Sequence, residues 1–168
     1  HLNHMIAHPN NVSHNTYATI PGFVMMDPLL LSTWDSIGPT LCETWCRRNT
    51  DVAKKGVHVV AIFLANEHWF PVWMVPHGRT LVAHVIQDPF VDHQILLPLL
   101  AVMKESLEFE ETVLHTIPCP LPQHELCGAA AVAFLGHVMV GADLPQTLSD
   151  LKDYHANMKA GFVNALFD

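Results

Sequence analysis

Three short apolar segments follow one another between residues 56 and 88, and turn residues separate them. They read "GVHVVAIFLA", "HWFPVWMVP" and "RTLVAHVIQD". β-Branched and aromatic residues dominate each segment, while Asn66-Glu67 and Pro76-His77-Gly78 have the composition of turns. This pattern predicts three successive β-strands, so the rest of the chain must pack around a sheet.

Segments with helical spacing lie on both sides of these strands. Ile37, Leu41 and Trp45 recur at helical intervals before Arg47-Arg48-Asn49, which predicts a helix over 38–49. The stretch "VDHQILLPLLAVMKESLEFEE" is also helical, with a kink or a start near Pro98. "TVLHTIP" predicts a further strand, and "CGAAAVAFLGHVMV" and the tail "DLPQTLSDLKDYHANMKAGFVNALF" predict two more helices. The fold class is therefore α+β.

The length and composition favour one packed domain. The chain has 168 residues, of which 50% are hydrophobic and 14% charged, so it has enough apolar area to bury a core. The first 22 residues are rich in His, Asn and Pro without periodicity. We expect residues 1–22 to form an extended arm over a single domain spanning 23–168.

Charge and hydropathy exclude two classes of partner. The formal net charge is −8 with eight Lys and Arg, which is unsuited to binding a phosphate backbone, so we expect no nucleic-acid partner. The apolar run 129–142 contains His137 and is shorter than a membrane span, so we expect a buried helix and no membrane association.

Four cysteines are too few for a disulfide scaffold in a chain of this size, which favours an intracellular, reducing compartment such as cytoplasm or nucleus. The sequence begins at His1 and no basic, apolar leader opens it, so we expect a fragment or a processed product.

Cys127 stands where the Ala-rich helix is expected to begin. Cysteine chemistry requires a thiolate, and the backbone N–H groups and dipole at a helix N-terminus stabilise one. A general base would be a histidine oriented by a carboxylate. His68 opens one predicted strand and Asp88 ends the next, so pairing of these strands should bring the two side chains to the same end of the hairpin.

Together these residues resemble a known family. "VVAIFLANEHWFPVWMVPHGRTLVAHVIQDPF" followed by "TVLHTIPCPLPQHELCGAAAVAFLGHVMVGA" is similar to the catalytic core of the ubiquitin-like-protein proteases, the superfamily of SUMO-deconjugating and adenovirus-type cysteine proteases. His68-Trp69, Asp88, Gln123 and Cys127-Gly128 occur in the family's order, and the resemblance covers residues 57 to 142.

The resemblance implies a papain-like core, a central mixed sheet flanked by helices, with the nucleophile at a helix N-terminus. It implies that Cys127 is the nucleophile, His68 the base, Asp88 its orienter and Gln123 an oxyanion donor beside the Cys127 N–H. The family usually carries its glutamine about six residues before the cysteine and an aspartate directly before it. Here Gln123 is four residues before, and Leu126 precedes Cys127.

A second part of the resemblance concerns substrate binding. "STWDSI" is similar to the family's Trp-Leu-x-Asp motif, whose tryptophan helps to wall a channel for a Gly-Gly tail. The resemblance thus implies that Trp34 and Trp69 line a substrate channel. It implies a protein substrate, such as one carrying ubiquitin or a ubiquitin-like modifier.

Structural roles compete with these assignments. Cys127 alone could be a small core residue, Asp88 a turn opener before Pro89, and Trp69 and Trp73 core aromatics. Glu67, next to His68, is a fallback orienter, and Gln87, next to Asp88, is a fallback donor. Structural zinc needs paired Cys and His units, and although Cys42 and Cys46 have the spacing, they lie inside a predicted amphipathic helix. We therefore expect no metal site and no cofactor.

The sequence thus predicts a cysteine peptidase that cleaves a peptide or isopeptide bond of a modifier conjugate or a polyprotein. Two alternatives stay open: an acetyltransferase on the same fold, and a catalytically silent modifier-binding module. Transfer would require an acyl-CoA site, for which cations are scarce. A silent module would normally lose the Cys or the His, and both are present.

Overall fold

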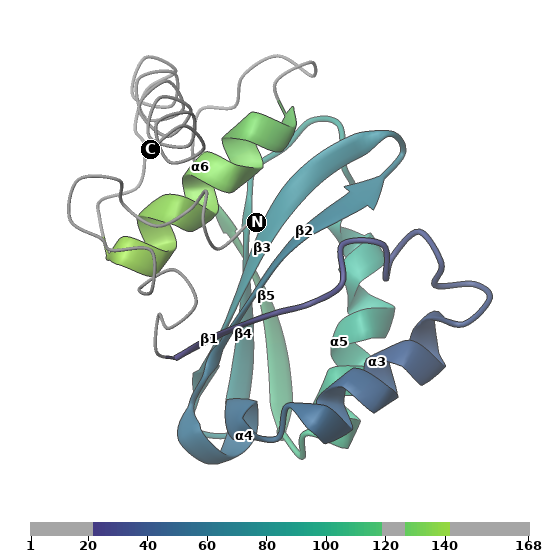
Figure 1. Cartoon of the computed structure of the whole chain (residues 1–168), viewed down its shortest axis with the longest axis vertical. Coiled ribbons are helices and arrows are strands. Elements are labelled where there is room, and N and C mark those ends of the chain that lie inside the picture. Colours follow the sequence, from purple (N-terminus) through teal and green to yellow (C-terminus); the bar gives the residue numbers. More distant parts are fainter. Residues whose placement is uncertain (1–21, 119–126, 142–168) are drawn as a thin grey trace, which may run out of the picture. The chain divides into compact units, whose positions relative to one another are not determined.

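The computed structural model describes residues 22–118 and 127–141. The chain divides into two compact units, one of residues 22–118 and one that includes residues 119–168 and 1–21. The first unit holds a five-stranded mixed sheet with helices, and the described part of the second is one helix (Figure 1). The expected arm of residues 1–22 lies outside the described residues except for Gly22, and so does the tail helix expected beyond residue 142.

The sheet runs in the order β1-β2-β3-β4-β5. The strands are β1 (Phe23–Met25), β2 (His58–Ala65), β3 (His68–His77), β4 (Thr80–Ile86) and β5 (Glu111–Ile117). β2, β3 and β4 form an antiparallel meander, while β1 pairs parallel with β2 and β5 pairs parallel with β4. The predicted α+β class and the three central strands are confirmed, and β1, a three-residue strand, is an addition that its short sequence does not signal.

The helices of the first unit are α3 (Gly38–Arg48), the short α4 (Asp51–Lys55) and α5 (Leu97–Ser106), which follows the 3₁₀ turn η1 (His93–Leu96). Pro98 stands in the first turn of α5, where its missing N–H costs no hydrogen bond, so the helix starts there rather than kinking. The predicted helix over 38–49 corresponds to α3, and the short α4 that follows it was not predicted.

The buried face of α3 differs from the apolar spacing in its sequence. Ile37 and Leu41 are 51% and 40% exposed, whereas Cys42 and Cys46 are fully buried. Gly38 continues this buried row at the same i, i+4 interval. Small side chains therefore face the sheet, and the two cysteines are free thiols packed into the core.

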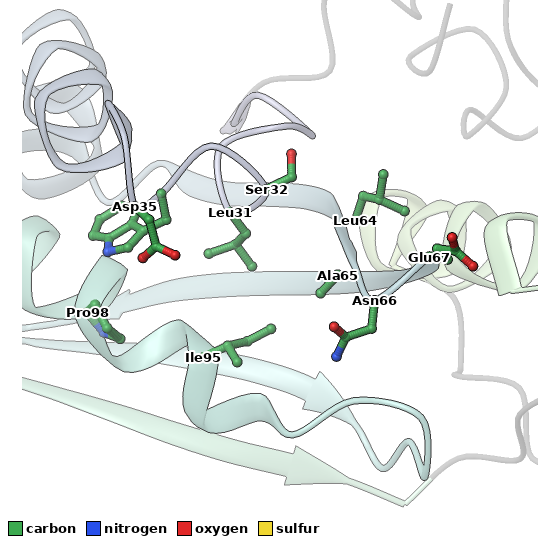
Figure 2. A pocket seen from close by; sticks show the side chains of 10 residues that line it. Leu31, Ser32, Asp35, Leu64, Ala65, Asn66, Glu67, Ile95 and Pro98 are labelled. Carbon is green, nitrogen blue, oxygen red and sulfur yellow. The ribbon is translucent and has the colours of Figure 1, made fainter.

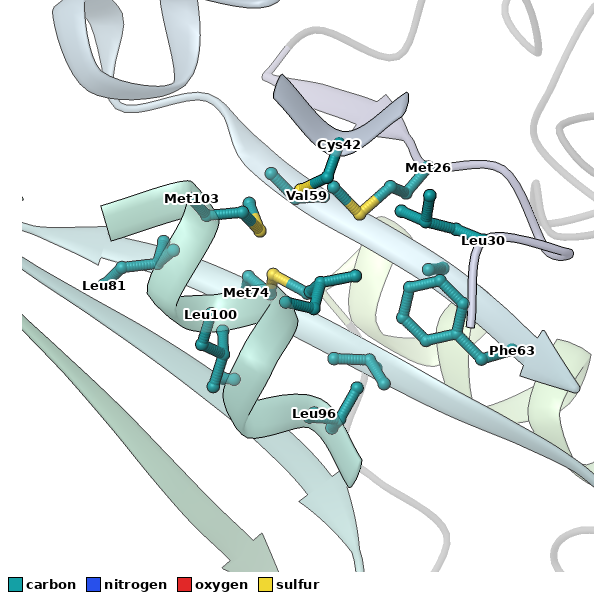
Figure 3. Close-up of a cluster of buried hydrophobic side chains, with 14 of the residues drawn as sticks. Met26, Leu30, Cys42, Val59, Phe63, Met74, Leu81, Leu96, Leu100 and Met103 are labelled. Carbon is teal, nitrogen blue, oxygen red and sulfur yellow. The ribbon is translucent and has the colours of Figure 1, made fainter. Parts of the chain in front are cut away.

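The core of the first unit lies between the sheet and helices α3 and α5 (Figure 3). Alternate residues of each central strand point into it because side chains of a strand alternate between faces. These are Val59, Ala61 and Phe63 of β2, Phe70, Val72 and Met74 of β3, and Leu81, Ala83 and Val85 of β4. The helices supply Cys42, Leu96, Leu100 and Met103, so the register of the sheet is strongly specified.

The second unit contributes α6 (Cys127–Val140), a helix of 14 residues that begins at Cys127. Its start matches the predicted helix, and Phe134 and Leu135 are among its buried residues. No helix in the described residues is both long and apolar enough to cross a membrane.

The turn between β2 and β3 has a strained backbone. Ala65 pairs with His68, so Asn66 and Glu67 form a two-residue turn, and their φ angles are 52° and 61°. Two consecutive residues with positive φ are typical of a type I′ turn, whose preferred sequence is Asn-Gly. Asn tolerates this region, whereas Glu is strained in it.

Replacing Glu67 by glycine should therefore stabilise the fold. We expect Glu67→Gly to raise the free energy of unfolding by about 0.5–1 kcal/mol, because glycine adopts positive φ without a steric cost. Urea unfolding checks this, with Glu43→Gly on the exposed face of α3 as the matched control, which should lower stability by about 1 kcal/mol. Destabilisation by both variants would contradict the strained-turn interpretation.

Stability should also depend on pH through two histidines of the sheet. Burial lowers the pKa of His58 and of His84, with nearby histidines adding to the effect. As pH falls below the ordinary histidine pKa of 6.5, the unfolded chain binds protons that the folded chain resists, so stability falls. We expect His84→Phe to flatten the dependence of Tm on pH between about 7.5 and 5.5. An unchanged slope would assign the dependence to other groups.

Candidate active site

The side chains of His68 and Asp88 meet at one end of the β3–β4 hairpin. His68 is the first residue of β3 and Asp88 follows β4 by two residues. The paired register ends at Val72 opposite Val85, and its continuation puts position 89 opposite His68. Strand pairing alone thus brings Asp88 within one residue of the histidine, as the sequence predicts.

The turn that makes this possible lies two residues later than expected. His77 pairs with Thr80, so the connection is Gly78-Arg79 rather than Pro76-His77-Gly78. Gly78 has φ of 58°, which explains its place at the start of a tight two-residue turn. Pro76 belongs to β3 and pairs with Leu81.

The His68–Asp88 contact is short and buried. His68 Nε2 donates to Asp88 Oδ2 at 2.6 Å, and the two side chains are 5% and 3% exposed. A buried carboxylate bonded to one imidazole nitrogen holds the ring in one orientation and one tautomer. Nδ1 is thereby the nitrogen that does not face the carboxylate, and it is the one suited to exchange a proton with a nucleophile.

Asp88 is itself held by the backbone. Its Oδ1 accepts a hydrogen bond from Phe90 N at 2.9 Å, the geometry of an Asx turn. Asp88 therefore forms the turn through Oδ1 and contacts the histidine through Oδ2. Glu67 is exposed at the hairpin tip. Gln87 is also exposed, and its backbone N–H donates to the Ile117 carbonyl at 3.0 Å. Asp88 thus holds the place beside His68 for which Glu67 was the fallback orienter, and the fallback donor role of Gln87 stays a prediction.

Two aromatic neighbours of the pair were not predicted. The Phe90 ring lies 5.2 Å from the His68 ring, and His93 packs against Phe70 at 5.6 Å. Burial lowers the pKa of His93, with Asp88 acting in the opposite direction. The Asp88-Pro89 turn could have signalled Phe90, because an Asx turn returns the chain toward the aspartate two residues later.

Cys127 is half-buried at the first position of α6. Its place at the N-terminus of a 14-residue helix matches the sequence expectation and suits a thiolate. Gln123 lies outside the described residues, so its oxyanion role stays a prediction. The catalytic roles of Cys127, His68 and Asp88 likewise stay predictions.

A pocket of about 540 Å³ opens beside the hairpin tip that leads into His68 (Figure 2). It is lined by Leu31, Ser32, Trp34 and Asp35 from the segment before α3, by Leu64–Glu67, and by Ile95 and Pro98. Trp34 is fixed in this wall because it packs over Gly38, where an added Cβ would lie 2.6 Å from the indole. A side chain at position 38 would displace it.

Trp69 occupies a different place from Trp34. It neighbours His68 in β3 and therefore points to the opposite face of the sheet, where it is half-buried. Trp73 shares that face and is also half-buried, so it lies outside the core cluster in which it was expected. The role of Trp34 and Trp69 as channel walls stays a prediction.

No group of three or more potential metal ligands occurs within residues 22–118 and 127–141. This finding concerns the described residues alone, and Cys119 and His124, which the sequence places near Cys127, fall outside them.

Known proteins resemble this chain in structure rather than in sequence. No protein-family model and no curated protein matches the chain. Solved structures do match, among them the SUMO protease Ulp1 with its catalytic cysteine oxidised to a sulfenic acid. It has a TM-score of 0.69 and 16% identity over 98% of this chain and 75% of that one.

Two further structures give the same result. The C-terminal Ulp1 protease domain in complex with Smt3, the yeast ortholog of SUMO, has a TM-score of 0.68 and 15% identity over 98% of this chain and 76% of that one. The Ulp1-like SUMO protease catalytic domain of Chaetomium thermophilum has a TM-score of 0.61 and 16% identity over 95% of this chain and 67% of that one. The chain therefore has the fold of the ubiquitin-like-protein proteases.

Proposed function

We propose that the chain is a cysteine peptidase that cleaves a peptide or isopeptide bond by acyl-enzyme chemistry. The observation that carries the proposal is the buried His68–Asp88 contact of 2.6 Å. The second support is Cys127 at the start of α6. The third is a fold shared with proteases that act on SUMO.

Each of these groups has a defined role in the reaction. His68 takes the proton of the Cys127 thiol, and the thiolate attacks the carbonyl carbon of the scissile bond. The resulting oxyanion accepts hydrogen bonds from the Cys127 N–H and the Gln123 side chain. The C–N bond then breaks as His68 returns the proton to the leaving amine, and water hydrolyses the thioester with His68 again as base. Asp88 keeps the imidazole oriented throughout.

The proposed substrate is a ubiquitin-like modifier conjugate. The Ulp1 domain of the same fold was solved in complex with Smt3. Trp34 and Trp69 would guide the narrow C-terminal tail of the modifier toward Cys127. A polyprotein with a similar cleavage site is the other substrate that the sequence leaves open, and we expect cleavage to take place in a reducing compartment.

Selective alkylation of Cys127 tests the thiolate–imidazole pair. At pH 6 to 7 we expect iodoacetamide to modify Cys127 faster than Cys42, because a hydrogen bond to Cys46 and burial raise the pKa of Cys42. His68→Ala should slow Cys127 alkylation by at least about tenfold. Peptide mass mapping assigns the modified cysteine, and His77→Ala at the exposed end of the same strand is the matched control. Equal rates in both variants would remove His68 from the site.

Modifier probes test the activity and the substrate class together. We expect SUMO or ubiquitin bearing a C-terminal electrophile to form an adduct on Cys127, visible as a mass increase of one modifier, and Cys127→Ala to form none. Asp88→Asn should slow hydrolysis of a modifier fusion by about 10²-fold or more, because the imidazole loses its orienting carboxylate. Product that forms only with acyl-CoA would instead indicate a transferase. Modifier binding with an unreactive Cys127 would indicate a silent binding module.

A further inference from the structure

Five rings cross the sheet on the face opposite the core. One comes from each strand, in the order Phe23, His58, Trp73, His84 and His115. Trp73 lies between Val72 and Met74, both of which point into the core, so its indole points to the other face. The catalytic chemistry proposed above uses none of these residues.

Trp73 fixes the position of the next ring in the row. Its indole N–H donates to His58 Nδ1 at 3.2 Å, so the tryptophan is held by the neighbouring strand. Its ring lies 4.8 Å from that of His84 at an interplanar angle of 34°, and the two residues face each other in the β3–β4 register. The His84 imidazole is therefore oriented before any ligand arrives.

His84 and His115 face each other across β4 and β5. They are direct partners in the parallel register, and their Nδ1 atoms are 3.0 Å apart. Their rings meet at 85° with centroids 5.1 Å apart. A hydrogen bond between the two Nδ1 atoms requires one ring to carry its proton on Nδ1 and the other on Nε2. When neither Nδ1 carries a proton, both lone pairs can coordinate the same metal ion.

The separation suits two ligands of one metal ion. Metal–nitrogen bonds of about 2.0–2.1 Å at angles between square-planar and tetrahedral place two imidazole nitrogens about 2.9–3.4 Å apart. Neutral imidazole, the majority form of an ordinary histidine at pH 7, is the form that binds metals.

We propose that His84 and His115 form a binding site for an imidazole-preferring divalent transition-metal ion, with Cu²⁺ bound more tightly than Ni²⁺ or Zn²⁺. Since no third His, Cys, Asp or Glu joins them among the described residues, the ion keeps exchangeable water ligands. The site is thus distinct from a four-ligand structural zinc centre. Its ion would link β5, the last strand in the sheet order, to β4.

The test compares the full chain with single variants, because a total binding isotherm is uninformative for a chain with thirteen histidines. We expect His84→Gln and His115→Gln each to lose the same one equivalent of Cu²⁺ in a calorimetric titration, with affinity at that site lowered at least tenfold. The double variant should lose no more than either single variant. His93→Gln, a histidine of η1 outside this row of rings, should bind Cu²⁺ like the wild type.

A second measurement needs no variant and is unaffected by any folding defect. Substoichiometric Cu²⁺ added to the wild-type chain should broaden the imidazole NMR signals of His84 and His115 before that of His93. Electron paramagnetic resonance should show hyperfine coupling to two imidazole nitrogens. Cu²⁺ affinity that is unchanged in both single variants, or broadening that spares these two rings, would overturn the proposal. Neither result depends on whether Cys127 is catalytic.

Discussion

The antiparallel pairing of β3 with β4 is the constraint on which the rest of this molecule depends. The register runs from His77 opposite Thr80 to Val72 opposite Val85, and its length carries His68 and Asp88 to a common end. Val72 and Met74, on the same face of β3 as His68, are buried in the core beside α3 and α5, so hydrophobic burial fixes the register. The polar contact at its end depends on that burial rather than supporting it.

Backbone strain and close packing both occur at the end of the sheet where the His68–Asp88 contact lies. The Asn66-Glu67 turn holds two residues at positive φ directly before His68, and Trp34 packs over Gly38 at the wall of the neighbouring pocket. Such local costs persist where the surrounding structure over-determines them, and they concentrate at functional sites. The turn and the pocket are therefore consistent with a substrate-binding role at this end of the sheet.

The parts of the fold that sequence could predict are those with strong local signals. The alternating segments around residues 56–88 specify β2 to β4, and the Ala-rich run specifies α6. The buried face of α3 was not predictable, because the limited space beside the sheet, rather than hydrophobicity, decides that Cys42 and Cys46 are the buried residues. β1 was missed because three residues are too few to show the alternation of apolar and polar residues that marks a strand. The parallel pairing of β1 with β2 and of β5 with β4 is set by tertiary packing.

In the candidate site, too, contacts set by local rules were predictable and contacts set by tertiary packing were not. His68 and Asp88 could be paired in advance because strand register is a local geometric rule, whereas Phe90 and His93 reach the pair through the path of a loop. The same rule extends to the other face of the strand: His68 and Phe70 point one way, and Trp69 and Trp73 the other. A slip of one residue in β3 would exchange these sets, removing His68 from Asp88 and Trp73 from His84 together. The β3–β4 register thus positions both the proposed catalytic pair and the indole that orients His84 of the proposed metal site.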